Sequence, residues 1–144
     1  MAGYMTKLQG YVYEGELVNG TGAPIENGAL VAVGTGSDAG KFILPAVNAN
    51  TKFVCKEATT IYGGVPAYRF IVKAIADPLY IVENGFEVNV GGEAEYDTRT
   101  YATKDGAYLR AHPLLVGEEF VTTMVTGTPV AGTEYTVKAD GTVG

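Results

Sequence analysis

Apolar and polar residues alternate over short stretches of this chain, and glycine, asparagine or proline separates one stretch from the next. Alternation with a period of two indicates a β-strand with one buried face. The longest example is residues 67–75 (AYRFIVKAI), whose apolar and cationic side chains fall on opposite faces: Tyr68, Phe70, Val72 and Ala74 against Arg69 and Lys73. This segment therefore predicts a strand that packs on a core.

Other segments share this extended character. In residues 51–57, Phe53 and Cys55 lie on one face and Val54 on the other, whereas residues 29–33 (ALVAV) form a continuous apolar run. β-Branched and aromatic residues are common in the remaining segments, which suits pleated, half-buried strands. Strands are thus predicted at residues 8–17, 29–33, 41–45, 51–57, 86–90, 119–125 and 134–139.

Turn signals lie between these segments. Asn-Gly and Asp-Gly pairs join a residue that tolerates positive φ to one that prefers it. The six prolines interrupt any long helix, and the best helical candidate is a short turn near residues 48–51. We therefore predict an all-β fold, a β-sandwich or β-barrel of short antiparallel strands with many glycine turns and little helix. The turn pairs occupy residues 19–20, 27–28, 84–85, 105–106 and 140–141.

Length and composition fit one domain. The chain has 144 residues, 20 of them glycine, and 47% are hydrophobic, with no shift in composition that would mark a linker. We predict a single β-rich domain over residues 1–144. Two interpretations of residues 1–10 stay open, an arm ordered alone or a loosely ordered arm that docks on a partner. The polar residues 91–106 are interpreted as an exposed excursion, two loops around an edge strand.

Charge and hydropathy exclude several kinds of partner. The 10 basic residues are scattered and outnumbered by 16 acidic ones, so the net charge of −6 disfavours nucleic acid and anionic membranes.

No run approaches the roughly 18 apolar residues of a membrane span, and the first residues hold no signal-peptide core. One cysteine cannot form an internal disulfide. We therefore expect a soluble protein made in the cytosol.

The stretch VGTGSDAGKF, residues 33–42, is close to a phosphate-binding loop. Such a loop needs glycine, four residues, glycine, lysine and then a hydroxyl residue at the start of a helix. Counted from Gly40 and Lys41, the first glycine is replaced by Thr35 and the hydroxyl residue by Phe42. The glycine spacing of dinucleotide-binding loops fails as well. We interpret the stretch as an exposed, mobile turn between two strands.

Catalytic and metal chemistry have few candidates. His112 is the only histidine and Cys55 the only cysteine, so zinc lacks its three or four ligands. The two residues could form a nucleophile pair, but Cys55 lies within an apolar alternation and is interpreted as a buried structural thiol. His112 is interpreted as a strand-end or interface residue. We assign no catalytic, cofactor-binding or metal-binding residue, no cofactor and no enzymatic activity, and a glycosidase-type carboxylate pair stays open.

Two further groups of residues are open to more than one interpretation. Glu93, Glu95 and Asp97 alternate, so one strand face could present all three to calcium, and a solvated acidic loop is the alternative. Glu118 and Glu119 adjoin and point to opposite sides of a strand, which prevents a shared acid–base site. Most tyrosines are expected at the edge of the core, with some in a protein contact as the alternative. The middle third holds Tyr62, Tyr68, Tyr80, Tyr96, Tyr101 and Tyr108.

Three parts of the chain resemble small structural proteins of tailed bacteriophages. They are ENGALVAVG, KFILPAVNANTKFVCKE and the stretch that runs from DGAYLRAHPLLVGEEF to TEYTVKADGTVG. The chain is similar in style to head decoration proteins, which bind the outer face of an assembled capsid, and to the capsid-anchoring bases of head fibres. The resemblance implies a capsid-binding or capsid-stabilising role without catalysis, and oligomers on the shell. It implies no particular contact residues.

The leading hypothesis is a non-enzymatic virion protein that binds the major capsid lattice and decorates or stabilises the head. It would act on the capsid surface as a homo-oligomer. One alternative is another virion part, such as a tail, head-completion or fibre subunit. A second alternative is a β-sandwich module that binds carbohydrate or a small ligand. A hydrolase comes last, because no convincing nucleophile–base pair can be proposed.

Overall fold

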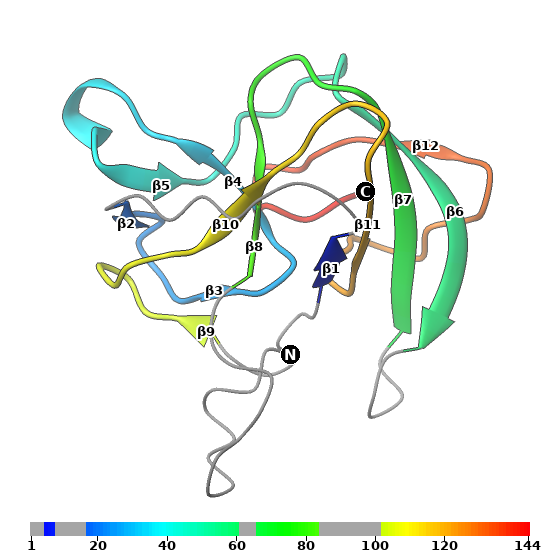
Figure 1. Cartoon of the computed structure of the whole chain (residues 1–144), viewed down its shortest axis with the longest axis horizontal. Helices are drawn as coiled ribbons and strands as arrows, with labels where there is room; N and C mark the ends of the chain where they lie inside the picture. Colours follow the sequence, from blue (N-terminus) through cyan, green and yellow to red (C-terminus); the bar gives the residue numbers. More distant parts are fainter. Residues whose placement is uncertain (1–4, 8–16, 61–65, 84–101) are drawn as a thin grey trace, which may run out of the picture.

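A computed structural model describes residues 5–7, 17–60, 66–83 and 102–144 of the chain. In these ranges the regular elements are strands and a single short 3-10 helix, η1 (Gly36–Asp38) (Figure 1). The strands pair into two five-stranded sheets and one two-stranded ribbon. The sheets are curled and arranged like a sandwich or half-barrel, so the predicted all-β fold is confirmed.

The first sheet lies toward the right of Figure 1 and is antiparallel throughout. Its strand order is β1 (Met5–Lys7), β11 (Glu119–Thr122), β7 (Pro66–Ala74), β6 (Lys52–Thr60) and β12 (Glu134–Tyr135). The second sheet has the order β10 (Ala111–Pro113), β8 (Tyr80–Val82), β4 (Leu30–Val33), β5 (Lys41–Ile43) and β2 (Val18–Asn19). The ribbon pairs β3 (Ile25–Glu26) with β9 (Ala102–Thr103). Among the described strands, β2 and β5 form the one parallel pair.

The main core lies between the two sheets. Phe53, Phe70 and Phe120 of the first sheet are fully buried, and Phe120 contacts both other rings at centroid distances of 5.4 and 5.5 Å. Leu30 and Ile81 of the second sheet complete this core from the opposite side. The two sheets therefore pack through an aromatic centre, and such ring pairs add to the stability that burial alone provides.

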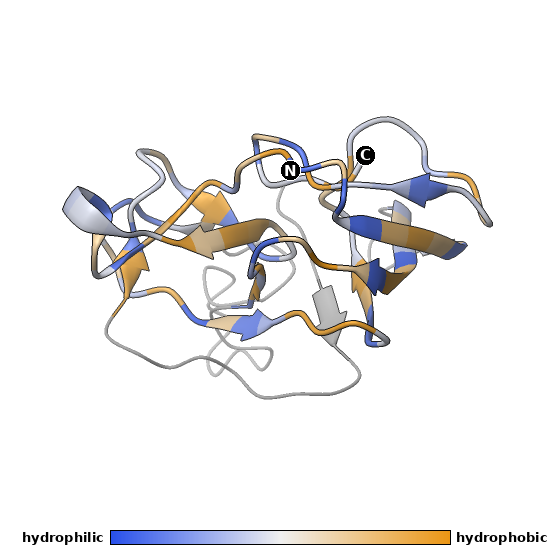
Figure 2. Ribbon diagram, turned by 90° about the horizontal axis from the view of Figure 1, so that it is seen from above, coloured by the Kyte–Doolittle hydropathy of each residue, from blue (hydrophilic) through white to orange (hydrophobic). Residues whose placement is uncertain are grey.

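The first half of β4 is buried on both of its faces. Leu30 faces the main core, while its neighbour Val31 faces a second core that includes Phe42 and Val82. Strands covered on both faces are apolar at successive positions rather than at alternate ones. The continuous apolar run begins for this reason, although Val33 at its end is 37% exposed. Strands toward the left of Figure 2 accordingly carry long orange stretches, whereas those toward the right show blue and orange side by side.

Strands β6 and β7 show the predicted alternation. Their predicted inner side chains are buried, except that Ala74 is half-buried at the end of β7. On the outer face, Arg69 pairs with Glu57 on β6 and lies 3.5 Å from Glu119 on β11 (Nε to Oε1), while Lys73 pairs with Glu134. Cross-strand charge pairs on the solvent face add little stability, so the core rather than these pairs holds the sheet together.

Several predicted boundaries are wrong. The strand predicted at residues 119–125 ends at Thr122, and the one at 134–139 ends at Tyr135. Residues 48–51 form a turn in which Thr51 N donates to the Asn48 carbonyl at 3.0 Å, and the short helix lies at η1 instead. The segments that follow β11 and β12 each bond to the C-terminal residues 142–144, which replaces a continuous ladder.

In three of the Asn-Gly and Asp-Gly pairs, the glycine has the positive φ that the turn prediction requires. Gly28, Gly106 and Gly141 have φ of 89°, 83° and 84°, and no described residue other than glycine has a positive φ. The asparagine or aspartate before each glycine keeps an ordinary negative φ, so only the glycine uses the conformational freedom that the pair offers. Asn19 and Gly20 form no such turn, because Asn19 is a buried residue of β2. The pair at 84–85 and the strand at 86–90 lie outside the described residues, as do residues 8–16.

Candidate functional site

Three loops meet at one end of the sandwich, at the top of Figure 1. They connect β5 to β6 (residues 44–51), β7 to β8 (75–79) and β10 to β11 (114–118), and together we call them the loop end. A hydrogen bond of 3.1 Å from Asn48 Nδ2 to Asp77 Oδ2 joins the first two loops. Leu114 N donates to the Leu79 carbonyl at 3.0 Å and joins the third.

The loop end exposes large apolar side chains. The exposed fraction is 59% for Val47, 55% for Leu115 and 63% for Val116, and Leu44 is 39% exposed. The third loop is held in shape from beneath, because the buried Glu118 accepts a hydrogen bond from Leu115 N at 2.9 Å. These side chains belong to the first and third loops, each of which bonds to the second. Exposed apolar side chains gathered at one end of a fold are candidates for an interaction site.

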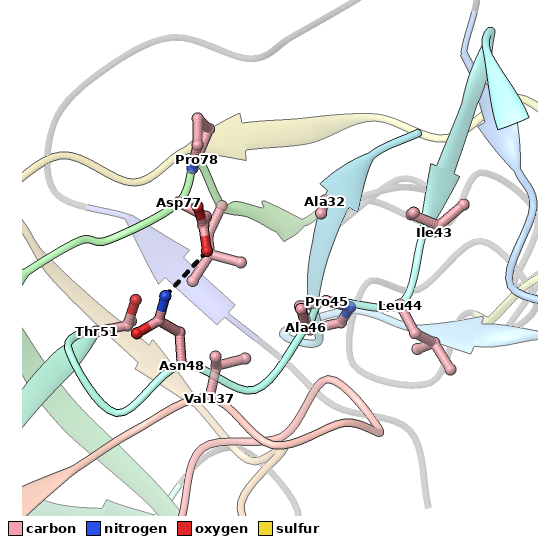
Figure 3. Close-up of a pocket in the computed structure, with 11 residues that line it drawn as sticks. Ala32, Ile43, Leu44, Pro45, Ala46, Asn48, Thr51, Asp77, Pro78 and Val137 are labelled. Carbon is pink, nitrogen blue, oxygen red and sulfur yellow. Dashed lines mark hydrogen bonds between the residues drawn. The ribbon is translucent and has the colours of Figure 1, made fainter. Parts of the chain in front are cut away.

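A pocket of about 280 Å³ opens among the first two of these loops (Figure 3). Its walls are mainly aliphatic, and its polar groups come from three residues of the loop end. The lining consists of Ala32, Ile43, Leu44, Pro45, Ala46, Leu79, Pro78 and Val137, together with Asn48, Thr51 and Asp77. An apolar pocket with a few convergent polar groups is the usual form of a binding site.

Asn48 fixes the orientation of the Asp77 carboxylate in this pocket. Its Oδ1 accepts from Asn50 N at 2.9 Å, and its backbone carbonyl accepts from Thr136 Oγ1 at 2.9 Å. These bonds leave Nδ2 directed at Asp77 Oδ2, as the dashed line in Figure 3 shows. Within the described part of the chain, no cationic side chain pairs with Asp77. The result is an oriented carboxylate beside an apolar wall.

Leu44 also lines a second pocket, of about 420 Å³, on the side toward β3. One of its two acidic lining residues, Asp140, is already engaged, because Asp140 Oδ1 accepts from Thr142 N at 3.0 Å and from Thr142 Oγ1 at 2.7 Å. The hydroxyl hydrogen bond from Thr142 lowers the pKa of Asp140. This carboxylate therefore stabilises its own turn. The remaining lining residues of the second pocket are Thr21, Ala23, Pro24, Ile25, Glu26, Ala29 and Met124.

His112 and Cys55 occupy separate environments. Cys55 is 1% exposed in the main core, and its Sγ donates to the Glu57 carbonyl at 4.0 Å. His112 Nε2 lies 2.6 Å from Glu83 Oε1, and its Nδ1 is buried without a hydrogen-bond partner among the described residues. The interpretation of Cys55 as a buried thiol is confirmed. His112 is the middle residue of β10 rather than its end, its side chain is 12% exposed, and it pairs with Glu83 rather than with the thiol. The interpretation of His112 as an interface residue stays a prediction.

Burial also sets the reactivity of the Cys55 thiol, because desolvation raises its pKa. We expect iodoacetamide to alkylate Cys55 at least about 100-fold more slowly in the folded protein than in urea. The folded thiol keeps its proton to higher pH than the unfolded one. The free energy of unfolding should therefore fall as the pH rises above about 8.5, the pKa of a free cysteine. Mass spectrometry and urea titrations at several pH values measure both effects.

Cys55→Ala provides the control for both measurements. It should incorporate no label, and it should lose the part of the pH dependence that comes from the thiol. Equal alkylation rates in buffer and in urea would show that Cys55 is accessible in the native state, contrary to its position in the core.

The glycine-rich stretch at 33–42 connects β4 to β5 through η1, which confirms its interpretation as an exposed turn between two strands. The helix has three residues, and Lys41 lies in β5 with its side chain over Gly20. An added Cβ at Gly20 would come within 2.7 Å of the Lys41 Cβ, so the glycine allows the two strands to approach. This lysine supports the β2–β5 pair rather than a phosphate cradle.

Of the remaining acidic candidates, one pair lies within the described residues and three residues lie outside them. Glu118 is buried and Glu119 lies on the outer face near Arg69, so the two point to opposite sides as predicted. Glu93, Glu95 and Asp97 lie outside the described residues. Within the described ranges, no group of three or more His, Cys, Asp or Glu could hold a metal ion. No helix in the same ranges is long and apolar enough to cross a membrane.

The described tyrosines of the middle third include both buried and exposed residues. Tyr68 is 7% exposed in the main core, and Tyr80 packs edge-to-face on Phe42 with a centroid distance of 5.6 Å. Tyr108, in contrast, is 68% exposed. Tyr62, Tyr96 and Tyr101 lie outside the described residues.

The loop end is what reasoning from sequence missed. Leu44 was predicted within a strand and no pattern marked Val47, Leu115 or Val116, since only their position beyond the strand ends leaves them exposed. A proline near each of the first two loops was the available signal, since proline commonly ends a strand. No protein-family model, curated protein or solved structure matches this chain, so its function must be argued from this site and from the sequence.

Proposed function

We propose that this protein is a non-enzymatic virion component that binds the major capsid lattice and decorates or stabilises the head. The sequence resemblance to small phage structural proteins suggests the class. The observation that carries the proposal is the group of exposed apolar residues on the loop end, Leu44, Val47, Leu115 and Val116. A rigid β-fold that presents apolar loops at one end has the form of a docking module.

Stabilisation of a capsid would follow from mass action. A protein that binds the assembled lattice and not its free subunits favours assembly in proportion to its affinity and concentration. Copies bound at adjacent lattice positions, or joined in a homo-oligomer, would add avidity without any new contact. The net charge of −6 directs this binding toward a protein surface and away from nucleic acid.

Sedimentation with capsids tests the proposal. The purified protein is mixed with shells assembled from the major capsid protein of the same genome, and the pellet is analysed. Saturable binding at micromolar concentration is expected. If the protein stays in the supernatant at that concentration, both with heads and with tails, the proposal is overturned.

Matched variants locate the contact. Val116→Asp on the loop end should weaken capsid binding at least about tenfold, because a charge would be buried in an apolar contact. Val130→Asp is the control, since Val130 is 61% exposed against 63% for Val116 but lies in the loop between β11 and β12. Equal loss from both variants would contradict docking through the loop end.

A second candidate function is binding of a carbohydrate or another small ligand. The pocket of about 420 Å³ beside β3 favours it, because small-molecule sites usually measure about 300–1,000 Å³. A glycan array tests this candidate. Binding that is lost in Met124→Asp, a change within that pocket, would support it, and an array without hits counts against carbohydrate.

A further inference from the structure

The smaller pocket has the form of a receptor for one long side chain. Its volume of about 280 Å³ lies at the lower limit of the range typical of small-molecule sites, about 300–1,000 Å³. It equals the volume of about nine water molecules in the liquid, at roughly 30 Å³ each. The walls from Ala32, Ile43 and Leu79 are aliphatic, and the Asp77 carboxylate is the charged group of the lining. A chain of methylene groups that ends in a cation matches both features.

We propose that this pocket receives a lysine side chain from the partner protein. The methylene groups of the lysine would lie on the aliphatic walls, and its ammonium group would reach Asp77. The identity of that partner as a capsid protein rests on the proposed function, whereas the chemistry of the pocket does not. This lysine contact would lie beside the exposed apolar residues of the loop end and would contribute specificity to binding there.

The hydrogen bond from Asn48 favours lysine over arginine. Asn48 Nδ2 occupies one of the two acceptor sites of Asp77 Oδ2, so a guanidinium that binds both carboxylate oxygens has fewer directions of approach. Lysine needs one acceptor, because its ammonium acts as a compact point charge. Asn48 is itself fixed by Asn50 and Thr136, so the carboxylate is oriented before any partner arrives. Such preorganisation lowers the entropy lost on binding.

Charge complementarity supports a cationic occupant. Glu57 and Glu134 on the first sheet each pair with a cationic side chain of this protein, whereas Asp77 pairs with none among the described residues. The surrounding exposed residues of the loop end are largely apolar, so few local cations compete for Asp77. A lysine on the partner would supply the missing charge where neighbouring apolar contacts exclude water, which strengthens the pair.

The first test uses a probe that copies the lysine side chain. Butylammonium is titrated into the labelled protein, and the amide NMR signals of Asn48, Asp77 and Leu79 are followed, with neutral butanol as the comparison. Saturable shifts at millimolar concentration with butylammonium, much reduced with butanol and in Asp77→Asn, are expected. Absence of shifts, or equal shifts with butanol, would overturn the proposal, because the carboxylate would then play no part.

The second test uses the capsid assay. Asp77→Asn should weaken binding about tenfold, while Asp38→Asn on η1 removes the same charge away from the pocket and should leave binding unchanged. Acetylation of capsid lysines should weaken wild-type binding and have little further effect on Asp77→Asn. If Asp77→Asn and Asp38→Asn both bind capsids as tightly as wild type, the lysine contact is overturned and the capsid proposal stands. If wild type does not bind capsids while butylammonium binds at Asp77, the capsid proposal fails and the pocket chemistry stands.

Discussion

Replacing Phe120 by alanine should lower the free energy of unfolding by about 3–5 kcal/mol, a large part of the roughly 5–15 kcal/mol that stabilises a typical domain. Phe120 has no exposed surface, and its ring packs edge-to-face on Phe53 and is stacked on Phe70. It lies on β11, between β1 and β7, so neither neighbouring strand can move in to fill the cavity without losing its pairing. Urea denaturation followed by circular dichroism measures the loss.

Val116→Ala is the control for this prediction. Val116 is 63% exposed, so its truncation should change the free energy of unfolding by no more than about 0.5 kcal/mol. A loss below about 1 kcal/mol for Phe120→Ala would mean that the two sheets do not meet through this ring.

The second large effect is expected for Gly141→Ala. Gly106→Ala is the matched control, because it separates the cost of the positive φ from the cost of a steric clash. Gly141 and Gly106 have nearly the same φ, 84° and 83°, which costs a residue with a side chain about 1–3 kcal/mol. At Gly106 an added Cβ meets nothing within 4 Å, whereas at Gly141 it would lie 2.7 Å from the Leu30 carbonyl oxygen. Gly141→Ala should therefore cost more than Gly106→Ala, by about 1–3 kcal/mol.

The extra cost arises because the two backbones cannot separate freely. Leu30 N donates to the Gly141 carbonyl at 2.7 Å, and moving Gly141 away would break this bond beside the core. Thermal and urea unfolding of the two alanine variants measure the difference. Equal destabilisation would show that only the φ matters, and that the backbone at residue 30 can adjust.

The sequence predicted the parts of this fold that obey a local period. Alternation located β6 and β7 and their inner faces, because a strand with one solvent face records burial at every second residue. The ends of β11 and β12 were not predictable in this way. Those residues are β-branched and suit a strand, but their backbone bonds go to residues 142–144, which no local pattern reveals.

The candidate site was less predictable than the fold, for a similar reason. Asn48 and Asp77 are separated along the chain, and neither belongs to a motif that would link them. Their contact depends on β6 and β7 running as an antiparallel pair, which returns the chain to the same end of the sheet. The exclusion of a phosphate loop at residues 33–42 needed only local spacing and was therefore open to reasoning from sequence.

The bond between Leu30 and Gly141 has a consequence for synthesis. Strand β4 is near the start of the chain and sits between the two cores, yet its backbone partner emerges from the ribosome more than a hundred residues later. Val143, which is fully buried, arrives later still. Closure of such distant contacts is slow, and partly made chains leave apolar strands uncovered. Nascent copies of this protein should therefore leave β4 partly uncovered until residues 141–143 have emerged.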